Sequence, residues 1–265
     1  WNFPIAIPAW KIMPALVAGN TIVFKPSSDT PRCAADLVKI VTETGIPRGV
    51  LNMVTGPAET VGKAIVQHPK IRAISFTGSR ETGEWIARNA GIKRVGLELG
   101  GKNGILVMED ADLELAAEGI LWGAFGTTGQ RCTAASRVIV HEKVKRKLVE
   151  LLVKRMKKLK IGNGKNAGTD IGPLINKAAV EKTKRFVEIG KREGRLACGG
   201  NALNEKGFFF EPTIFTHVKP GARIAQEEIF GPVLALIPVK SLEQGIKVLN
   251  GTSYGLSSSI YTNNL

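Results

Sequence analysis

The sequence contains few of the residues that build metal centres and disulfide frameworks. It has three cysteines and three histidines in 265 residues. The cysteines, Cys33, Cys132 and Cys198, are an odd number, lie far apart and form no CxxC pair, and no histidine has a second metal-type ligand at useful spacing. We therefore expect no metal site, no disulfide framework and a reducing, cytoplasmic compartment.

Long apolar runs and a leader-like start are also missing. No apolar stretch of the sequence approaches the roughly 20 residues that span a bilayer, and no basic-then-apolar segment opens the chain. We expect no membrane partner. Hydrophobic residues make up 43% and charged residues 23%, a globular composition that suffices for one large or two smaller domains.

Acidic residues are outnumbered by basic ones, 23 against 37, so the net charge is +14. Much of the surplus lies in residues 143–160, whose apolar positions recur at helical spacing, which places the lysines and arginines on the solvated face. With two tyrosines and no recognition motif, the chain is not expected to bind nucleic acid. A positive field attracts anionic cofactors and substrates instead.

Strand-like and helix-like segments alternate along the first hundred residues. Short connections between them favour a parallel sheet with right-handed crossovers. We expect a buried first strand, and we expect Asp29 or Thr30 to cap the helix that begins at Pro31. The expected strands are 21–25, 50–55, 72–76 and 94–99, and the helices are 8–18, 31–45, 59–67 and 80–90.

Ligands of parallel sheets bind beyond the carboxyl ends of the strands. Lys25 and Ser28 follow the first expected strand, Gly62 lies after the second, and Gly78 and Ser79 follow the third. Helix N-termini with glycine and serine can bind anions. No GxGxxG motif is formed, however, so ordinary turns and caps are the simpler interpretation of these residues alone.

Cys132 lies in a loop, residues 126–134, that is rich in glycine and threonine. Gly126 and Gly129 are expected to adopt backbone conformations closed to other residues, which lets the loop bring a thiol and N–H groups close to a ligand. A nucleophilic cysteine needs an electropositive setting or a base. Arg131 is adjacent, although its side chain can point either way. A small buried hydrophobic residue is the alternative role for Cys132.

Carboxylates stand at two further turns. Glu98 ends an apolar strand-like stretch and precedes two glycines, and Glu228 and Phe230 precede a Gly-Pro turn. A buried, unpaired carboxylate is costly, so each is solvated, paired or functional. The two glycines indicate a sharp connection or a hinge between domains.

Together, these stretches resemble the aldehyde dehydrogenase superfamily over the whole chain. Several independent motifs occur in that family's order and approximate spacing, which makes coincidence very improbable. Complete members are nearly twice as long, and the chain begins without Met, so we expect a central fragment truncated at both ends. The motifs are WNFP (1–4), FKPS (24–27), FTGS (76–79), ELGGK (98–102), GQRC (129–132), IGPL (171–174), EIFGP (228–232) and YGL (254–256).

The resemblance implies an α/β fold and a nicotinamide-dependent oxidoreductase. A Rossmann-like parallel-sheet domain for the dinucleotide would span residues 1–99, and an α/β catalytic domain would span residues 100–265. The substrate would be a small aldehyde or semialdehyde, the product its carboxylic acid, and the complete protein a homodimer or homotetramer. The family binds its cofactor without the usual glycine fingerprint.

The resemblance also implies roles for single residues. Cys132 would attack the carbonyl, giving a thiohemiacetal and then a thioester, while Asn2 and the Cys132 N–H would stabilise the oxyanion. Glu98 would activate the hydrolytic water. Within the cofactor site, Lys25 would hold the adenosine ribose, Ser79 the pyrophosphate and Glu228 the nicotinamide ribose. The matched cofactor positions are Lys25, Ser28, Gly62, Gly78, Ser79, Leu99, Glu228 and Phe230.

Ser28 departs from the pattern of NAD-preferring members, which commonly carry Glu there. A carboxylate would accept from the ribose 2′-OH and repel a 2′-phosphate, whereas serine leaves Lys25 to attract the phosphate. We therefore expect NADP to be accepted and favoured over NAD. The motif variants look most like 2,5-dioxopentanoate and related semialdehyde dehydrogenases.

Three other functions remain open. A CoA-acylating member would use the same Cys132 but deacylate with a thiol, and Glu98 as water activator argues against it. A cysteine hydrolase would need a histidine near Cys132, and no sequence feature selects one. A fragment that cannot close its site would be a scaffold or inactive.

Overall fold

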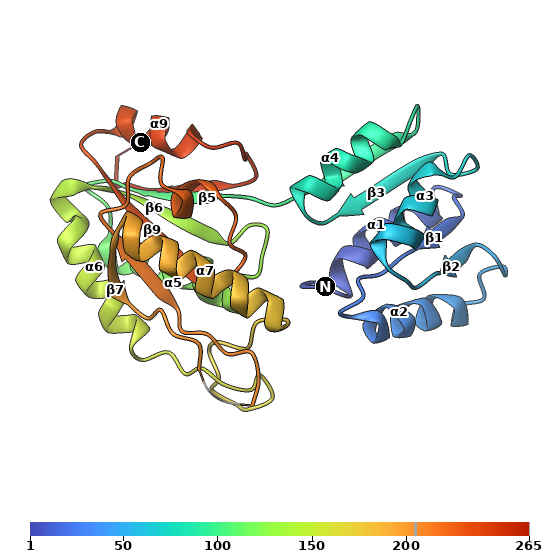
Figure 1. The fold of residues 1–265 in the computed structure, drawn as a ribbon, viewed down its shortest axis with the longest axis horizontal. Helices are drawn as coiled ribbons and strands as arrows, with labels where there is room; N and C mark the ends of the chain where they lie inside the picture. The colour runs from blue at the N-terminus through green and yellow to red at the C-terminus, as the bar shows by residue number, and fades with distance from the viewer. Residues whose placement is uncertain (204–205, 265) are drawn as a thin grey trace. The chain divides into compact units, whose positions relative to one another are not determined.

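The computed structural model describes residues 1–203 and 206–264, so Leu265, the last residue of the expected catalytic domain, lies outside it. The chain divides into two compact units, Trp1–Leu99 and Gly100–Leu265, each with its own apolar cores (Figure 1). Among the described residues, no helix is both long and apolar enough to cross a bilayer. The mixed α/β fold with parallel strands is the one expected from the sequence.

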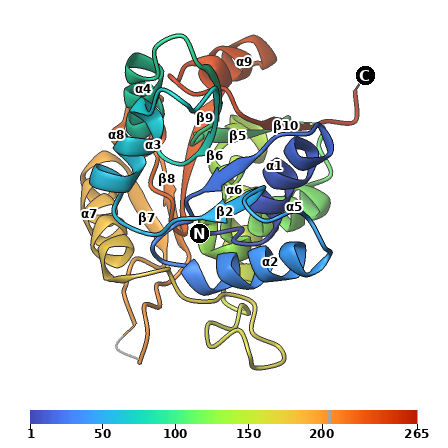
Figure 2. The same ribbon diagram turned by 90° about the vertical axis from the view of Figure 1, so that its right-hand side faces the viewer.

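The first unit contains two pairs of parallel strands and the helices that connect them. Strand β1 (Ile22–Phe24) pairs with β2 (Leu51–Met53), and β3 (Ala73–Thr77) pairs with β4 (Arg94–Glu98). Each pair has its own apolar core, formed with α1 and α2 for the first pair and with α3 and α4 for the second. These four helices are labelled in Figure 2. The connecting elements are α1 (Ala6–Val17), α2 (Pro31–Glu43), the π-helical turn η1 (Ala58–Gly62), α3 (Lys63–Gln67) and α4 (Arg80–Asn89).

Three details of this unit differ from expectation. In the described chain the four strands form two separate pairs, not one continuous sheet, and β1 and β2 are only three residues long. The first strand is not buried, since Val23 is 42% exposed. Thr30 occupies the N-cap of α2 but makes no side-chain cap hydrogen bond, and Pro31 occupies the first helical position.

The second unit is built on a six-stranded sheet in the order β10-β5-β6-β9-β8-β7, in which only β7 runs antiparallel to its neighbour among the described strands. Its strands are β5 (Asn103–Val107), β6 (Ala135–His141), β7 (Arg195–Cys198), β8 (Thr213–Thr216), β9 (Val233–Val239) and β10 (Ser258–Tyr261). Its helices are α5 (Leu113–Phe125), the 3₁₀ turn η2 (Gly126–Gly129), α6 (Glu142–Met156), α7 (Lys177–Glu193), α8 (Arg223–Gln226) and α9 (Leu242–Asn250).

Helices cover both faces of this sheet, as a parallel sheet requires. Helices α5 and α6 lie on one face and α7 and α9 on the other (Figure 1). Val107 and Val138 pack in the core on the α5–α6 side, and Leu106 and Ile139 in the core on the α7–α9 side. The basic helix predicted at 143–160 is α6, whose buried positions lie on one side. Strands β5 and β6 are parallel neighbours, so the ELGGK segment and the Cys132 loop, which lead into them, approach the sheet from the same end.

Candidate active site

The Cys132 loop begins with a left-handed turn. After α5, Thr127, Thr128 and Gly129 have φ angles of 56°, 59° and 67°. This conformation costs a residue with a side chain roughly 1–2 kcal/mol, and it is least favourable for a β-branched residue. Gly129 adopts the special conformation expected of it, but the expectation was wrong for Gly126, whose φ is −54°. The strain falls on the two threonines instead.

The turn is held from one side by residues 172–175. The hydroxyl of Thr128 donates to the Gly172 carbonyl at 2.9 Å. The amide of Gln130 accepts from the Ile175 N–H at 2.9 Å and donates to the Pro173 carbonyl at 3.2 Å. Thr128 and Gln130 are both buried. The IGPL motif therefore anchors the segment that precedes Cys132.

The segment that contains Cys132 is held from the other side by Asn103. The side-chain amide of Asn103 donates to the carbonyls of Cys132 and Ala134 at 2.6 and 3.0 Å. Gly101 packs against the same carbonyl, and a Cβ built on it would lie 2.7 Å from the Cys132 oxygen. Gly101 and Asn103 thus lie against the backbone of the cysteine itself.

The Arg131 guanidinium is held at the C-terminal end of α5. It stacks 4.0 Å from the centre of the Trp122 ring and donates to the carbonyls of Trp122 and Gly123 at 2.8 and 3.3 Å. A cation at the C-terminal carbonyls of α5 is favourable. Cys132 is a half-buried free thiol, and Arg131 does not supply it with a direct hydrogen-bond donor.

The EIFGP motif meets the glycine pair. The Gly101 N–H donates to Glu228 Oε1 at 3.1 Å, and a Cβ on Gly100 would overlap the same carboxylate. Phe230 has a left-handed φ of 59°. A Cβ on Gly129 would overlap the carbonyl of Gly231. Glu228 and Phe230 therefore belong to a segment that touches both the glycine pair and the cysteine loop.

Two buried cations lie beside these contacts. Lys102 is 2% exposed, and its Nζ has no hydrogen-bond partner among the described residues. Burial lowers the pKa of Lys102 to about 7, with Arg137 acting in the same direction and Glu228 opposing it. Burial also lowers the pKa of Arg137 to about 10. Arg137 donates to the carbonyls of Lys102, Val248 and Leu249 at 2.9, 3.0 and 2.9 Å.

In the first unit, candidate residues lie at the strand ends, as predicted. The Lys25 ammonium donates to the carbonyls of Pro26 and Gly56 at 2.8 and 3.3 Å, where β1 and β2 end. Ser28 is exposed in the following turn, and Gly62 ends η1. Lys25 and Ser28 therefore both lie in the connection between β1 and α2.

The other candidates of the first unit surround the ends of β3 and β4. Ser79 caps α4 by accepting from the Thr82 N–H at 3.3 Å. The Gly78 N–H donates to the Glu98 carbonyl at 3.1 Å. The Leu99 side chain packs so closely on Gly83 of α4 that a Cβ on Gly83 would overlap it. Gly78 and Glu98 are therefore neighbours at one end of the β3–β4 pair.

Asn2 is half-buried ahead of α1 in this unit. Lys11, on α1, donates to the Ser75 hydroxyl at 2.9 Å. Burial lowers the pKa of Lys11, and the charge of Glu98 opposes this shift. Asn2 and Glu98 belong to the first unit and Cys132 to the second.

Five residues of the candidate site were not predicted from the sequence: Lys11, Lys102, Asn103, Gln130 and Arg137. Two of them could have been found from the sequence as polar residues that directly precede an apolar run: Asn103 before Gly-Ile-Leu-Val and Arg137 before Val-Ile-Val. Each of these two residues is buried and bonds to carbonyls of distant segments.

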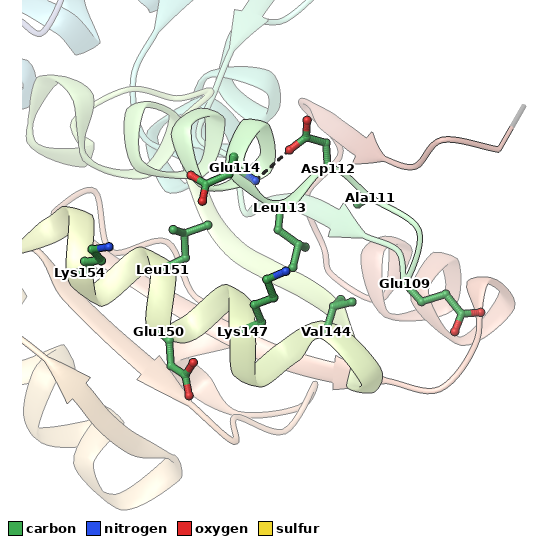
Figure 3. Close-up of a pocket in the computed structure, with 10 residues that line it drawn as sticks. All are labelled: Glu109, Ala111, Asp112, Leu113, Glu114, Val144, Lys147, Glu150, Leu151 and Lys154. Carbon is green, nitrogen blue, oxygen red and sulfur yellow. Dashed lines mark hydrogen bonds between the residues drawn. The ribbon is translucent and has the colours of Figure 1, made fainter.

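The described part of the second unit contains two pockets. One, of about 520 Å³, lies between α5 and α6 and contains no predicted site residue (Figure 3). Its Asp112 caps α5, and its Glu109 pairs with Lys143. A second, of about 430 Å³, is lined by Lys102, Asn103 and the 249–258 segment, which includes YGL. The described residues contain no cluster of three or more metal-type ligands.

Comparison with known proteins gives one family. The model described as "Aldehyde dehydrogenase family" matches residues 1–265. A 1-pyrroline-5-carboxylate dehydrogenase from Anoxybacillus flavithermus is 45% identical over all of this chain and 53% of its own length. An alpha-ketoglutaric semialdehyde dehydrogenase from Bacillus subtilis is 43% identical over all of this chain and 56% of its length.

Solved structures agree with this result. The crystal structure of 1-pyrroline-5-carboxylate dehydrogenase from Thermus with bound NAD superposes with a TM-score of 0.97 at 43% identity, covering all of this chain and 52% of that one. The chain therefore spans about half the length of the relatives that it matches.

Proposed function

Because the chain belongs to the aldehyde dehydrogenase family, we propose that the complete protein oxidises an aldehyde or semialdehyde to the carboxylic acid with NAD or NADP. The carrying observation is the set of contacts on the Cys132 loop. The IGPL motif hydrogen-bonds to this loop, and Gly101 of ELGGK and Gly231 of EIFGP pack closely against its backbone. Asn103, directly after ELGGK, donates to the Cys132 carbonyl. A loop held so firmly and strained at two threonines is typical of a functional site.

In this proposal Cys132 is the nucleophile. Its thiolate adds to the carbonyl carbon, giving a thiohemiacetal, and loss of hydride leaves a thioester. The Cys132 N–H and the Asn2 amide would stabilise the oxyanion. In support, the backbone hydrogen bonds of the described residues do not use the Cys132 N–H, so it remains a donor. Glu98 takes a proton from the water that hydrolyses the thioester, releasing the acid and the thiolate.

The dinucleotide site is proposed at the strand ends of the first unit and at Glu228 and Phe230. Three features fit a dinucleotide: the Lys25 ammonium keeps one N–H after its two bonds to carbonyls, Ser79 begins a ten-residue helix, and Gly78 precedes it. Helix N-termini suit pyrophosphate. A bound NAD or NADP would supply the hydride acceptor. The Thermus relative's bound NAD supports this assignment. The remaining proposed contacts are Ser28, Gly62 and Leu99.

NADP is the cofactor that Ser28 favours. Ser28 is exposed, so a carboxylate at this position would face a bound ribose without losing its charge to burial. Such a carboxylate would repel the 2′-phosphate of NADP, whereas serine carries no charge and does not repel it. The preference for NADP is therefore carried by this one residue.

The proposed substrates are 2,5-dioxopentanoate and related semialdehydes, with the Bacillus subtilis relative in support. The Anoxybacillus relative favours 1-pyrroline-5-carboxylate as a second candidate. A cytoplasmic homodimer or homotetramer is the assembly proposed for the complete protein.

The test measures NADP and NAD reduction by the complete natural polypeptide that carries these residues. The panel contains succinate semialdehyde, 2,5-dioxopentanoate and 1-pyrroline-5-carboxylate, with Cys132→Ala and Glu98→Gln as variants. We expect aldehyde-dependent NADPH formation that Cys132→Ala abolishes. Glu98→Gln should retain the first half-reaction and accumulate the thioester. Activity that requires CoA would replace the proposal with an acylating enzyme, and no reduction of either cofactor would refute it.

A further inference from the structure

We propose that Asn103 is a positioning residue for Cys132, holding the nucleophile loop in the direction that the reaction needs. The inference rests on the proposed role of Cys132 as nucleophile. Asn103 is the first residue of β5 and is 5% exposed. It touches the backbone of the loop and acts through Cys132.

The side chain of Asn103 uses its hydrogen-bonding groups on three separate points of the chain. Nδ2 donates to the carbonyls of Cys132 and Ala134 at 2.6 and 3.0 Å, which are the two donors that an amide has. Oδ1 accepts from the Ser257 N–H at 3.0 Å. Because the acceptor side is tied to the 257 segment, the amide cannot flip without losing all three bonds.

A bulge in the sheet explains why a side chain is needed here. Asn103 pairs with Ala135, but the next residue, Gly104, pairs with Arg137, so Ser136 is an extra residue on β6. Bulges interrupt the ladder and re-aim neighbouring side chains, and they often occur beside active sites. The carbonyls of residues 132 and 134 lie just before this bulge, where the regular β5–β6 ladder does not reach. Asn103 supplies the donors in its place.

These bonds fix both peptide planes that flank the Cys132 Cα. Asn103 fixes the carbonyl that follows it, and the Ala134 N–H fixes the preceding plane by donating to the Arg131 carbonyl at 3.0 Å. With both planes fixed, the direction of the Cα–Cβ bond and of the Cys132 N–H is fixed too. The thiol and the proposed oxyanion donor therefore keep one relative orientation.

The first variant is Asn103→Asp, which keeps the shape and replaces the donor pair by an oxygen facing two carbonyl oxygens. We expect kcat to fall by about 10²-fold, the cost of a displacement of roughly 1 Å at a reacting group, with KM for the cofactor unchanged. Asn103→Ser is the milder second variant, which shortens the side chain and adds no charge. Asn103→Ser should also lower kcat and leave KM for the cofactor unchanged, with a smaller fall in kcat than Asn103→Asp.

The second readout is alkylation of single cysteines by iodoacetamide, followed over pH by peptide mass spectrometry. Cys33, on α2 of the other unit, is the internal reference. In both Asn103 variants the alkylation rate of Cys132 should fall relative to Cys33. Ser241→Ala, which removes the Ser241 cap of α9, is the matched control: it should lower Tm and leave the Cys132-to-Cys33 ratio unchanged.

A folded Asn103 variant with wild-type kcat and a wild-type alkylation ratio overturns the proposal. So does a ratio that changes as much in Ser241→Ala, because Asn103 would then serve general stability. Alkylation needs no aldehyde or cofactor, so it tests Asn103 even if the complete protein reduces neither NAD nor NADP. Conversely, if the wild type oxidises aldehydes and the Asn103 variants have the same kcat and alkylation ratio as the wild type, the proposed function stands and this inference is refuted.

Discussion

Replacing Lys102 by methionine should stabilise the protein near neutral pH and much less at alkaline pH. The ammonium is 2% exposed and has no hydrogen-bond partner among the described residues. Burial lowers the pKa of Lys102 from 10.5 to about 7. At 1.36 kcal/mol per pKa unit, this shift corresponds to an upper bound of about 5 kcal/mol for the cost of the buried charge.

The pH dependence has a definite sign. Between about pH 7 and pH 10.5 the unfolded chain keeps the Lys102 proton while the folded protein has lost it. The unfolded state then binds more protons, so wild-type stability rises with pH in this window. Below about pH 7 both states are protonated and the full cost is present. Lys102→Met removes a group with this dependence, so its gain should be largest below pH 7 and should fall towards pH 10.5.

Urea unfolding of the wild type and of Lys102→Met at several pH values across this window measures the effect. Lys158→Met is the matched control, because Lys158 is an exposed lysine on the same unit. We expect no pH-dependent gain from the control. A gain from Lys102→Met that does not vary with pH, or a loss at every pH, would refute the reasoning, because the ammonium would then be paired or solvated in the folded protein.

Two further changes test the loop and the cofactor site. Gly129→Ala puts a Cβ at a φ of 67° and against the Gly231 carbonyl, so steady-state kinetics should show about a 10²-fold loss of kcat and thermal unfolding a lower Tm; wild-type values of both would contradict the geometry. Ser28→Glu should shift the ratio of kcat/KM for NADP over NAD towards NAD by at least about tenfold, since a carboxylate repels the 2′-phosphate. An unchanged ratio would remove Ser28 as the determinant.

Local pattern predicted the elements of the first unit and α6 of the second, but not their partners. The helical spacing of 143–160 identified α6, and the Ser79 position identified the start of α4. The first strand is shorter and more exposed than expected because its apolar run says nothing about what covers each face. Only the packing of α1 and α2 on β1 and β2 decides that.

The candidate site was predicted in part for a similar reason. Cys132 was selected by its loop composition and by the family motif. Asn103 and Gln130 were not, because they act on carbonyl and N–H groups that are 29 to 154 residues away in sequence. Such contacts depend on the sheet order β10-β5-β6-β9, which no local propensity encodes.

The strained turn shows how the loop depends on the unit around it. Left-handed threonines persist only where surrounding contacts over-determine them, and Thr128 carries both the strain and one of the compensating bonds, to Gly172. The other bonds come from residues 173–175 and from Asn103, on different elements. None of these donors and acceptors is in place until β5, β6 and the 172–175 segment have assembled. The orientation of Cys132 is therefore a property of the folded second unit. Loosened packing in this unit should change the orientation of the Cys132 thiol before the sheet unfolds.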